Sequence, residues 1–194
     1  MMKKLTRVEE LERTRKRILD VAEDLFMEKG FRAVSTREIA QHAKVTQPTL
    51  YHHFKDKESL YMVMLERFVL SIQKKLKQVS KDDMAKAIEE MLIILSIEHP
   101  SSIMLMMHDI SLELSEENKY KIYSIWRQTY LEPFMDLFER NEKKHLRKQI
   151  TPEQAARFCL FTLGQAMLSK GNPESLKEQF KTHVDIILYG TIEN

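Results

Sequence analysis

Apolar residues recur at steps of three and four along most of this chain, and this spacing restricts its fold more than any other feature. The first clear example runs Ile18, Val21, Ala22, Leu25 and Phe26, which would form one apolar stripe on a helix. No stretch shows the alternating, β-branched pattern that is typical of strands. Only four Gly and five Pro interrupt the 194 residues. We therefore predict an all-α protein of about nine helices.

Capping residues indicate where the first predicted helices begin and end. Gly30 can adopt the left-handed conformation that ends the first helix. Ser35 and Glu38 have the spacing of a capping box, in which each side chain bonds the other residue's amide, and would begin a short second helix. Thr46 is placed to cap a third helix and Asp56 a fourth.

The remaining helices are predicted from the same periodicity. Pro133 should kink the longest of them, because it lacks an N–H and crowds the carbonyl group of Thr129. Thr151 and Gln154 have the spacing of a second capping box. The predicted ranges are 57–79, 84–99, 100–107, 120–144, 151–171 and 172–190.

Composition excludes several classes of protein. No apolar run approaches the ~18 residues of a membrane span, and the charged N-terminus lacks the apolar stretch of a secretory signal. The single cysteine, Cys159, fits a reducing compartment and is expected to be a small buried hydrophobe, so we expect a cytoplasmic protein. No nucleophile–base set, metal cluster or phosphate-binding glycine loop is visible, which predicts a protein that is not an enzyme and has no cofactor.

Positive charge is weighted towards the N-terminal part of the chain. Residues 1–60 hold 13 Lys and Arg against 10 Asp and Glu, a balance of +3, whereas the whole chain carries only +2. This imbalance alone is a weak sign of nucleic-acid binding, because a basic tail is more often a solvated arm.

Two short helices joined by the three-residue turn 44–46 form a predicted helix-turn-helix. Leu50 and Phe54 lie one turn apart and should point inward. The outer face of the second helix would present hydrogen-bonding side chains suited to base edges and phosphates, because an α-helix fits the major groove. These side chains are Gln47, Thr49, Tyr51, His52 and His53.

Residues 18–57 resemble the DNA-binding region of the tetracycline-repressor family throughout their length. The resemblance is carried by Gly30-Phe31, Thr36-Arg37-Glu38-Ile39-Ala40 and Thr49-Leu50-Tyr51-His52-His53-Phe54. It implies a three-helix DNA-binding domain at residues 1–60 and a larger helical ligand-binding and dimerisation domain at residues 61–194.

The resemblance also implies roles for single residues. Arg37 would read a guanine and Gln47 an adenine, since their side chains match the donors and acceptors of those bases. His52 departs from the tetracycline repressor's pattern, so base preference cannot be copied from it. The positions expected to fix register on phosphates are Thr36, Thr49, Tyr51, His53 and Lys57. The complete predicted DNA-binding set is Thr36, Arg37, Gln47, Pro48, Thr49, Tyr51, His52, His53 and Lys57.

The larger domain is expected to bind an apolar or aromatic molecule between its helices, although an ordinary Met-rich core would have the same composition. The predicted ligand-binding residues are Met91, Met104, Met107, His108, Tyr123, Trp126, Tyr130, Phe134 and Gln165. The last two helices are expected to pair with those of a second copy. The predicted dimer residues are Phe158, Phe161, Leu163, Met167, Leu176, Phe180, Val184 and Leu188.

Two functional readings follow from these features. The first is a repressor that binds a palindromic operator as a homodimer until a hydrophobic inducer shifts the fourth helix. The rival is a ligand-independent, architectural or division-related DNA-binding protein controlled by a protein partner. A metal site is not predicted: adjacent His52 and His53 point about 100° apart on a helix, and His99, His108, Asp109 and Glu113 lack a recognised ligand spacing.

Overall fold

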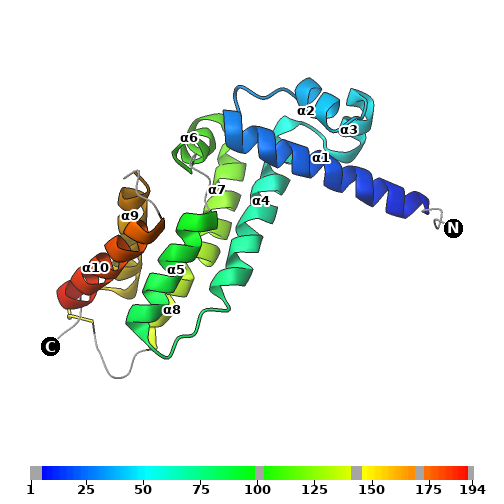
Figure 1. Ribbon diagram of the computed structural model, residues 1–194. Helices are drawn as coiled ribbons and strands as arrows, with labels where there is room; N and C mark the ends of the chain where they lie inside the picture. The colour runs from blue at the N-terminus through cyan, green and yellow to red at the C-terminus, as the bar shows by residue number, and fades with distance from the viewer. Residues whose placement is uncertain (1–5, 99–102, 141–145, 169–172, 192–194) are drawn as a thin grey trace. The chain divides into compact units, whose positions relative to one another are not determined.

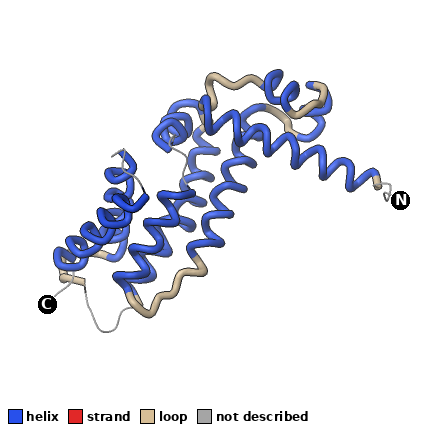
Figure 2. Tube along the Cα trace, viewed as in Figure 1, coloured by secondary structure: helices blue, strands red, loops and turns tan. Residues whose placement is uncertain are grey.

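The computed structural model describes residues 6–98, 103–140, 146–168 and 173–191, and the regular elements in these ranges are helices joined by short loops (Figure 2). Three of them, α7, a π-helical turn η1 and α8, follow one another without a break, so nine separate helices are described. The elements are α1 (Arg7–Lys29), α2 (Thr36–His42), α3 (Gln47–His53), α4 (Lys57–Leu76), α5 (Met84–Glu98), α6 (Ile103–Glu113), α7 (Glu116–Trp126), η1 (Arg127–Leu131), α8 (Glu132–Glu139), α9 (Pro152–Leu168) and α10 (Pro173–Thr191) (Figure 1). The prediction of an all-α fold is confirmed.

The helices pack into two compact units. The first comprises residues 1–67 and 102–122, so it contains α1, α2, α3, the start of α4, α6 and most of α7. The second comprises residues 68–101 and 123–194. These two units are defined by packing alone. The predicted boundary at residue 60, between a DNA-binding and a ligand-binding domain, concerns function and stays a prediction. None of the described helices is both long and apolar enough to cross a membrane.

The first helix begins earlier than its apolar stripe indicates. Its N-cap is Thr6, whose N–H donates to Glu9 Oε2 at 2.7 Å, while the Glu9 N–H donates to Thr6 Oγ1 at 3.2 Å. This is a complete capping box. Periodicity did not reveal this part of the helix because its side chains are mostly exposed and have no stripe to bury.

The predicted kink at Pro133 is instead a π-helical turn just before it. In η1 the N–H of Glu132 donates to the carbonyl group of Arg127, five residues earlier. Pro133 has no N–H to offer Thr129, and its ring crowds that carbonyl group. One wider turn absorbs the mismatch without ending the helix, which is how π-bulges commonly arise. The predicted helix 100–107 also differs, because α6 extends to Glu113.

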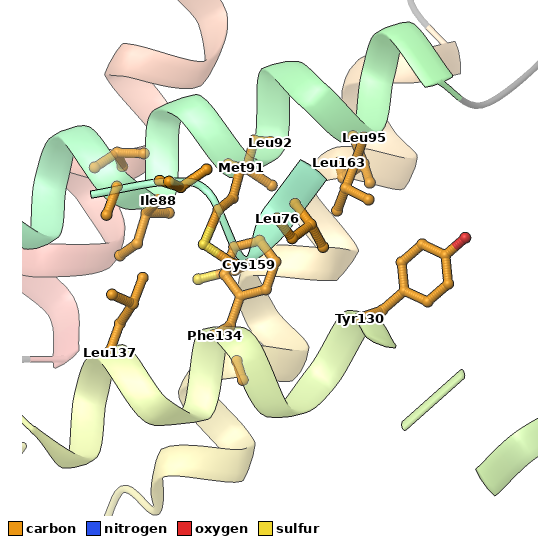
Figure 3. Packing of buried hydrophobic residues seen from close by; sticks show 14 of the residues in the cluster. Leu76, Ile88, Met91, Leu92, Leu95, Tyr130, Phe134, Leu137, Cys159 and Leu163 are labelled. Atoms are coloured by element: carbon orange, nitrogen blue, oxygen red, sulfur yellow. The ribbon is translucent and has the colours of Figure 1, made fainter. Parts of the chain in front are cut away.

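The second unit has an apolar core built from α5, η1, α8, α9, α10 and the end of α4. Met91, Phe134 and Cys159 are at most 1% exposed, and the Phe134 ring points towards the other two (Figure 3). Burial raises the pKa of the Cys159 thiol to about 12, so the thiol stays protonated at neutral pH. Cys159 is therefore a buried hydrophobe, as predicted.

Candidate nucleic-acid interface

The start of α2 is fixed by its cap, although only half of the predicted capping box forms. The Glu38 N–H donates to Ser35 Oγ at 3.1 Å. The Glu38 carboxylate does not reach back to Ser35 but accepts from Lys29 Nζ at 2.8 Å. That hydrogen bond is the main reason why the pKa of Glu38 is lowered and that of Lys29 is raised. Lys29 thus links the end of α1 to α2.

The turn between α2 and α3 requires one unusual backbone conformation. Lys44 has a φ of 54°, in the left-handed region that non-glycine residues seldom adopt. The turn is stabilised by hydrogen bonds from the Lys44 N–H to the Gln41 carbonyl group and from the Val45 N–H to the Ala40 carbonyl group, at 3.1 and 3.0 Å. Thr46 then caps α3 as predicted, accepting from the Thr49 N–H at 3.2 Å.

The inner face of the helix pair is buried, as the spacing predicted. Leu50 is 0% and Phe54 3% exposed, and Ile39 of α2 and its C-cap residue Ala43 are both 0% exposed. The Arg15 guanidinium lies over the Phe54 ring, 4.9 Å from its centroid, which connects α1 to the end of α3. These contacts fix the outer face of α3 relative to α2.

All nine residues predicted to bind DNA lie on α2, α3 or the start of α4, within the first unit. The exposed members are Arg37, Gln47, Pro48, Tyr51 and His52, and the half-buried ones are Thr36, Thr49, His53 and Lys57. The hydroxyl groups of Thr36 and Tyr51 lie 3.0 Å apart and join the two helices on their outer side. The arrangement places two candidate base-reading side chains among several candidate phosphate ligands, and their contact with DNA stays a prediction.

His53 faces an open cleft between α3 and the N-terminal part of α1, which contributes Arg7 and Thr14 to the lining. Its Nε2 atom is buried and has no hydrogen-bond partner among the described residues. Burial, followed by the positive charges of His52 and Arg15, lowers its pKa. A neutral imidazole at neutral pH would serve a phosphate as a hydrogen-bonding group, not as a cation.

Lys57 begins α4, which Asp56 caps as predicted by accepting from the Ser59 N–H at 2.7 Å. The Lys57 Nζ atom lies 4.2 Å from the centroid of the Phe31 ring. Burial lowers the pKa of Lys57, and the nearby carboxylates of Glu113 and Asp109 act in the opposite direction. The side chain is held against Phe31 and is therefore oriented before any phosphate is present.

Two residues near this surface were missed from the sequence. Asp109 of α6 is 3% exposed and accepts from the backbone N–H of Phe31 at 2.5 Å. Glu58 accepts from Ser115 and Asn118 in the turn and first part of α7. Both contacts join residues more than 50 positions apart, which no local pattern can indicate.

The predicted ligand-binding residues are not all placed alike. Met91, Tyr130 and Phe134 are buried in the second unit, Trp126 is half-buried there, and Tyr123 and Gln165 are exposed. His108 is exposed and belongs to the first unit. The side chains of Met104 and Met107 lie outside those described.

Three rings form a continuous stack along α7 and η1. Tyr123 and Trp126 have their centroids 5.8 Å apart, and Trp126 and Tyr130 6.3 Å. Arg157 of α9 donates to the Tyr123 hydroxyl group at 3.0 Å and lies over Trp126.

The predicted dimer residues differ in their exposure. Leu163, Phe180 and Val184 are at most 5% exposed and lie in the core of their own copy, so a contact of these three with a second copy stays a prediction. Phe158 and Phe161 are 45% and 68% exposed. Leu176 and Leu188 are half-buried, and the Met167 side chain is not among those described. Ile186 and Tyr189 of α10, which are not among the predicted residues, are also exposed apolar side chains.

No group of three or more His, Cys, Asp or Glu residues within the described ranges is arranged to hold a metal ion. His108 Nδ1 lies 4.0 Å from Asp109 Oδ1, while His99 of the same sequence cluster falls outside those ranges.

A known protein family matches the part of the chain that contains these helices. Residues 18–63 match the model of bacterial regulatory proteins of the tetR family. Several curated regulators match over 54 to 58 residues, so the chain spans only 25–29% of the length of those relatives.

Longer matches extend beyond this region. The transcriptional regulator SAB2452 of Staphylococcus aureus is 30% identical over 131 residues, 66% of this chain and 69% of that protein. The transcriptional repressor KstR2 of Rhodococcus jostii is 28% identical over 183 residues, 91% of this chain and 90% of that protein. A solved transcriptional regulator from Rhodococcus sp. Rha1 has the same fold, with a TM-score of 0.75 and 20% identity over 91% of this chain and 97% of that one.

Proposed function

The chain belongs to the tetR family of bacterial transcriptional regulators, and on this premise we propose that it is a dimeric repressor, released from a palindromic operator by a small hydrophobic molecule. Because the family consists of regulators, the prediction that the chain is not an enzyme is confirmed. The observation that carries the proposal is the α2–α3 pair, with a buried inner face and an exposed, polar outer face.

Base reading is assigned to Arg37 and Gln47. Both side chains are exposed, the hydroxyl groups of Thr36 and Tyr51 join the two helices nearby, and Lys57 lies at the start of the next helix. An Arg fork matches the two acceptors of guanine, and a Gln amide matches the donor and acceptor of adenine. The other polar groups would then fix the register of α3 on the phosphates.

Repression and dimerisation draw on different support. The R. jostii relative that aligns with most of this chain is named a repressor. Exposed aromatic and aliphatic side chains on α9 and α10, including Phe161 and Tyr189, give a surface that a second copy can cover. Two copies related by a twofold axis would read two halves of a palindrome.

The preference for a hydrophobic inducer is based on the second unit. Its inward side chains are largely apolar, and Trp126 is half-buried between two tyrosines. Thr129 of η1 adds one polar group: it is 1% exposed, and its Oγ1 atom has no hydrogen-bond partner among the described residues. An apolar molecule with a hydroxyl or carbonyl group would satisfy this atom, whereas a polyanion would not be favoured.

The test begins with DNA selected from the host genome by the purified protein. Sequencing the bound fragments should return a palindrome, and fatty acids, quinones and aromatic drugs should then be screened for release of that DNA. A ligand that releases it should also change the fluorescence of Trp126, the only tryptophan, and a Trp126→Phe variant should lose that change. Release only by polyanionic metabolites would contradict a hydrophobic inducer, and loss of DNA binding only with a protein partner would favour the rival function.

A Thr129→Val variant tests the polar group directly. Valine keeps the shape of threonine and removes the unsatisfied hydroxyl group, so the free protein should be about 1–3 kcal/mol more stable to urea. The same variant should bind a hydroxyl-bearing ligand more weakly. A loss of stability would show that the hydroxyl group is satisfied in solution.

A further inference from the structure

We propose that Asp109 is a positioning residue for the DNA-binding helices, and that it holds the turn between α1 and α2 through the backbone N–H of Phe31. The proposal rests on the proposed function, because its consequence is measured on DNA. It adds a residue of α6, 78 positions away from Phe31, to the groups that organise the interface.

The first argument is the burial of Asp109. A carboxylate that is 3% exposed loses most of its hydration, which costs several kcal/mol unless hydrogen bonds replace the water. Here a backbone N–H donates to Oδ2 at 2.5 Å, so a hydrogen bond within the protein replaces part of that hydration. The N–H of Phe31 precedes α2 and has no helical partner, so the same bond satisfies a donor in the turn.

The second argument is what Phe31 contacts. Its ring packs against Phe26 and Tyr61 with centroids 5.8 and 4.9 Å away, and Lys57 Nζ lies 4.2 Å from its centroid. Phe31 is 9% exposed in this position. A shift of the Phe31 backbone would therefore move the ring that orients Lys57, a candidate phosphate ligand.

A second carboxylate, that of Glu58, joins the start of α4 to the residues that follow α6. Glu58, one residue after Lys57, accepts from the Ser115 N–H and Oγ, both at 2.7 Å, and from Asn118 Nδ2 at 2.8 Å. These three donors lower the pKa of Glu58. Asp109 of α6 thus contacts the turn after α1, and Ser115 and Asn118, which follow it in the chain, contact the start of α4. Both contacts come from residues 109–118, so this segment is part of the structure that holds the DNA-binding surface.

The experiment compares three variants of the full chain. Asp109→Ala removes the acceptor, Asp109→Asn removes the charge and keeps an oxygen acceptor, and Glu113→Gln is a matched control. Glu113 lies on the same helix with its charge near Lys57, while the Phe31 N–H is bonded to Asp109. Amide hydrogen exchange of Phe31 is measured without DNA, and affinity for a random-sequence DNA duplex is measured over a range of salt.

We expect Asp109→Ala to lose the exchange protection of Phe31 and to bind DNA about tenfold more weakly, with a smaller salt dependence. Asp109→Asn and Glu113→Gln should retain both properties, with the folded state of each variant checked by urea unfolding. The proposal would be overturned if either Asp109 variant lost the exchange protection of the Phe31 amide and still bound DNA with wild-type affinity. If the Ala variant does not fold, the Asn variant provides this test. Failure of the wild-type protein to bind any DNA would refute the proposed function, while Phe31 exchange would still report whether Asp109 holds the turn.

Discussion

Replacing Phe161 and Val184 separately by alanine distinguishes the surface between two copies from the core of one copy. Both were predicted from the sequence to lie between copies. The structure leaves Phe161 68% exposed on α9 and Val184 4% exposed on α10. The first change should weaken dimerisation with little effect on the folded protomer, and the second should destabilise the protomer itself.

The magnitudes follow from the exposed areas. A phenylalanine side chain buries about 200 Å², so the exposed 68% of Phe161 amounts to about 140 Å². At about 25 cal/mol per Å², covering it in a dimer contributes about 3.5 kcal/mol per copy, or about 7 kcal/mol for two copies. If half of that is realised, the dissociation constant of the Ala variant rises more than about a hundredfold. Val184→Ala instead loses two buried methyl groups and should cost roughly 2 kcal/mol of unfolding free energy.

Sedimentation over a dilution series gives the dimer dissociation constant, and urea unfolding at one protein concentration gives the stability. Phe180→Ala is the matched control for the aromatic ring, because Phe180 is 0% exposed on the neighbouring helix. It should cost about 3–5 kcal/mol of stability. Dimer unfolding depends on concentration, so stabilities are compared at equal concentration.

The reasoning fails if Phe161→Ala dimerises as tightly as the wild-type protein. It also fails if Val184→Ala dissociates the dimer while the protomer keeps its full stability. The first result would mean that the dimer interface does not include Phe161 of α9. The second would mean that Val184 contacts a second copy and not the core of its own copy.

Three further predictions concern the DNA-binding surface. Arg37→Ala and Gln47→Ala should each weaken binding to the selected DNA by about 1–3 kcal/mol and leave binding to random DNA unchanged. Equal losses on both kinds of DNA would mean that these side chains contact the DNA backbone and not the bases. Lys57→Ala should weaken both kinds of binding and reduce the slope of log K against log salt by about 0.9, so an unchanged slope would exclude a phosphate contact. Thr36→Val and Tyr51→Phe should show a coupling of about 0.5–1.5 kcal/mol in a double-mutant cycle of urea stability, because their hydroxyl groups lie 3.0 Å apart, and additive losses would mean that the bond is absent in solution.

The sequence determined the helical fold and most helix ends because both depend on neighbours in the chain. A stripe such as Ile18 to Phe26 repeats with the period of the helix, and caps such as Thr46, Asp56 and Thr151 bond amides within three residues. The positions of the candidate DNA-binding residues followed from the same local order together with the family resemblance.

Several features depended on residues that meet only after folding. The sequence could not show that Glu38 would pair with Lys29, because that choice depends on how α1 and α2 pack. The sequence also could not show which apolar residues of the last two helices are buried and which are exposed. Phe161 and Val184 are both apolar, but the packing of α5, α9 and α10 buries only Val184.

The contact of Asp109 with Phe31 is the extreme case. It joins α6 to the turn between α1 and α2, 78 residues away, through a backbone N–H, a donor that every residue except proline carries. Sequence patterns record which side chains are apolar, charged or able to cap a helix nearby. Which distant carboxylate satisfies a given amide is decided only by the tertiary structure, because burial removes the water that would otherwise bond both groups.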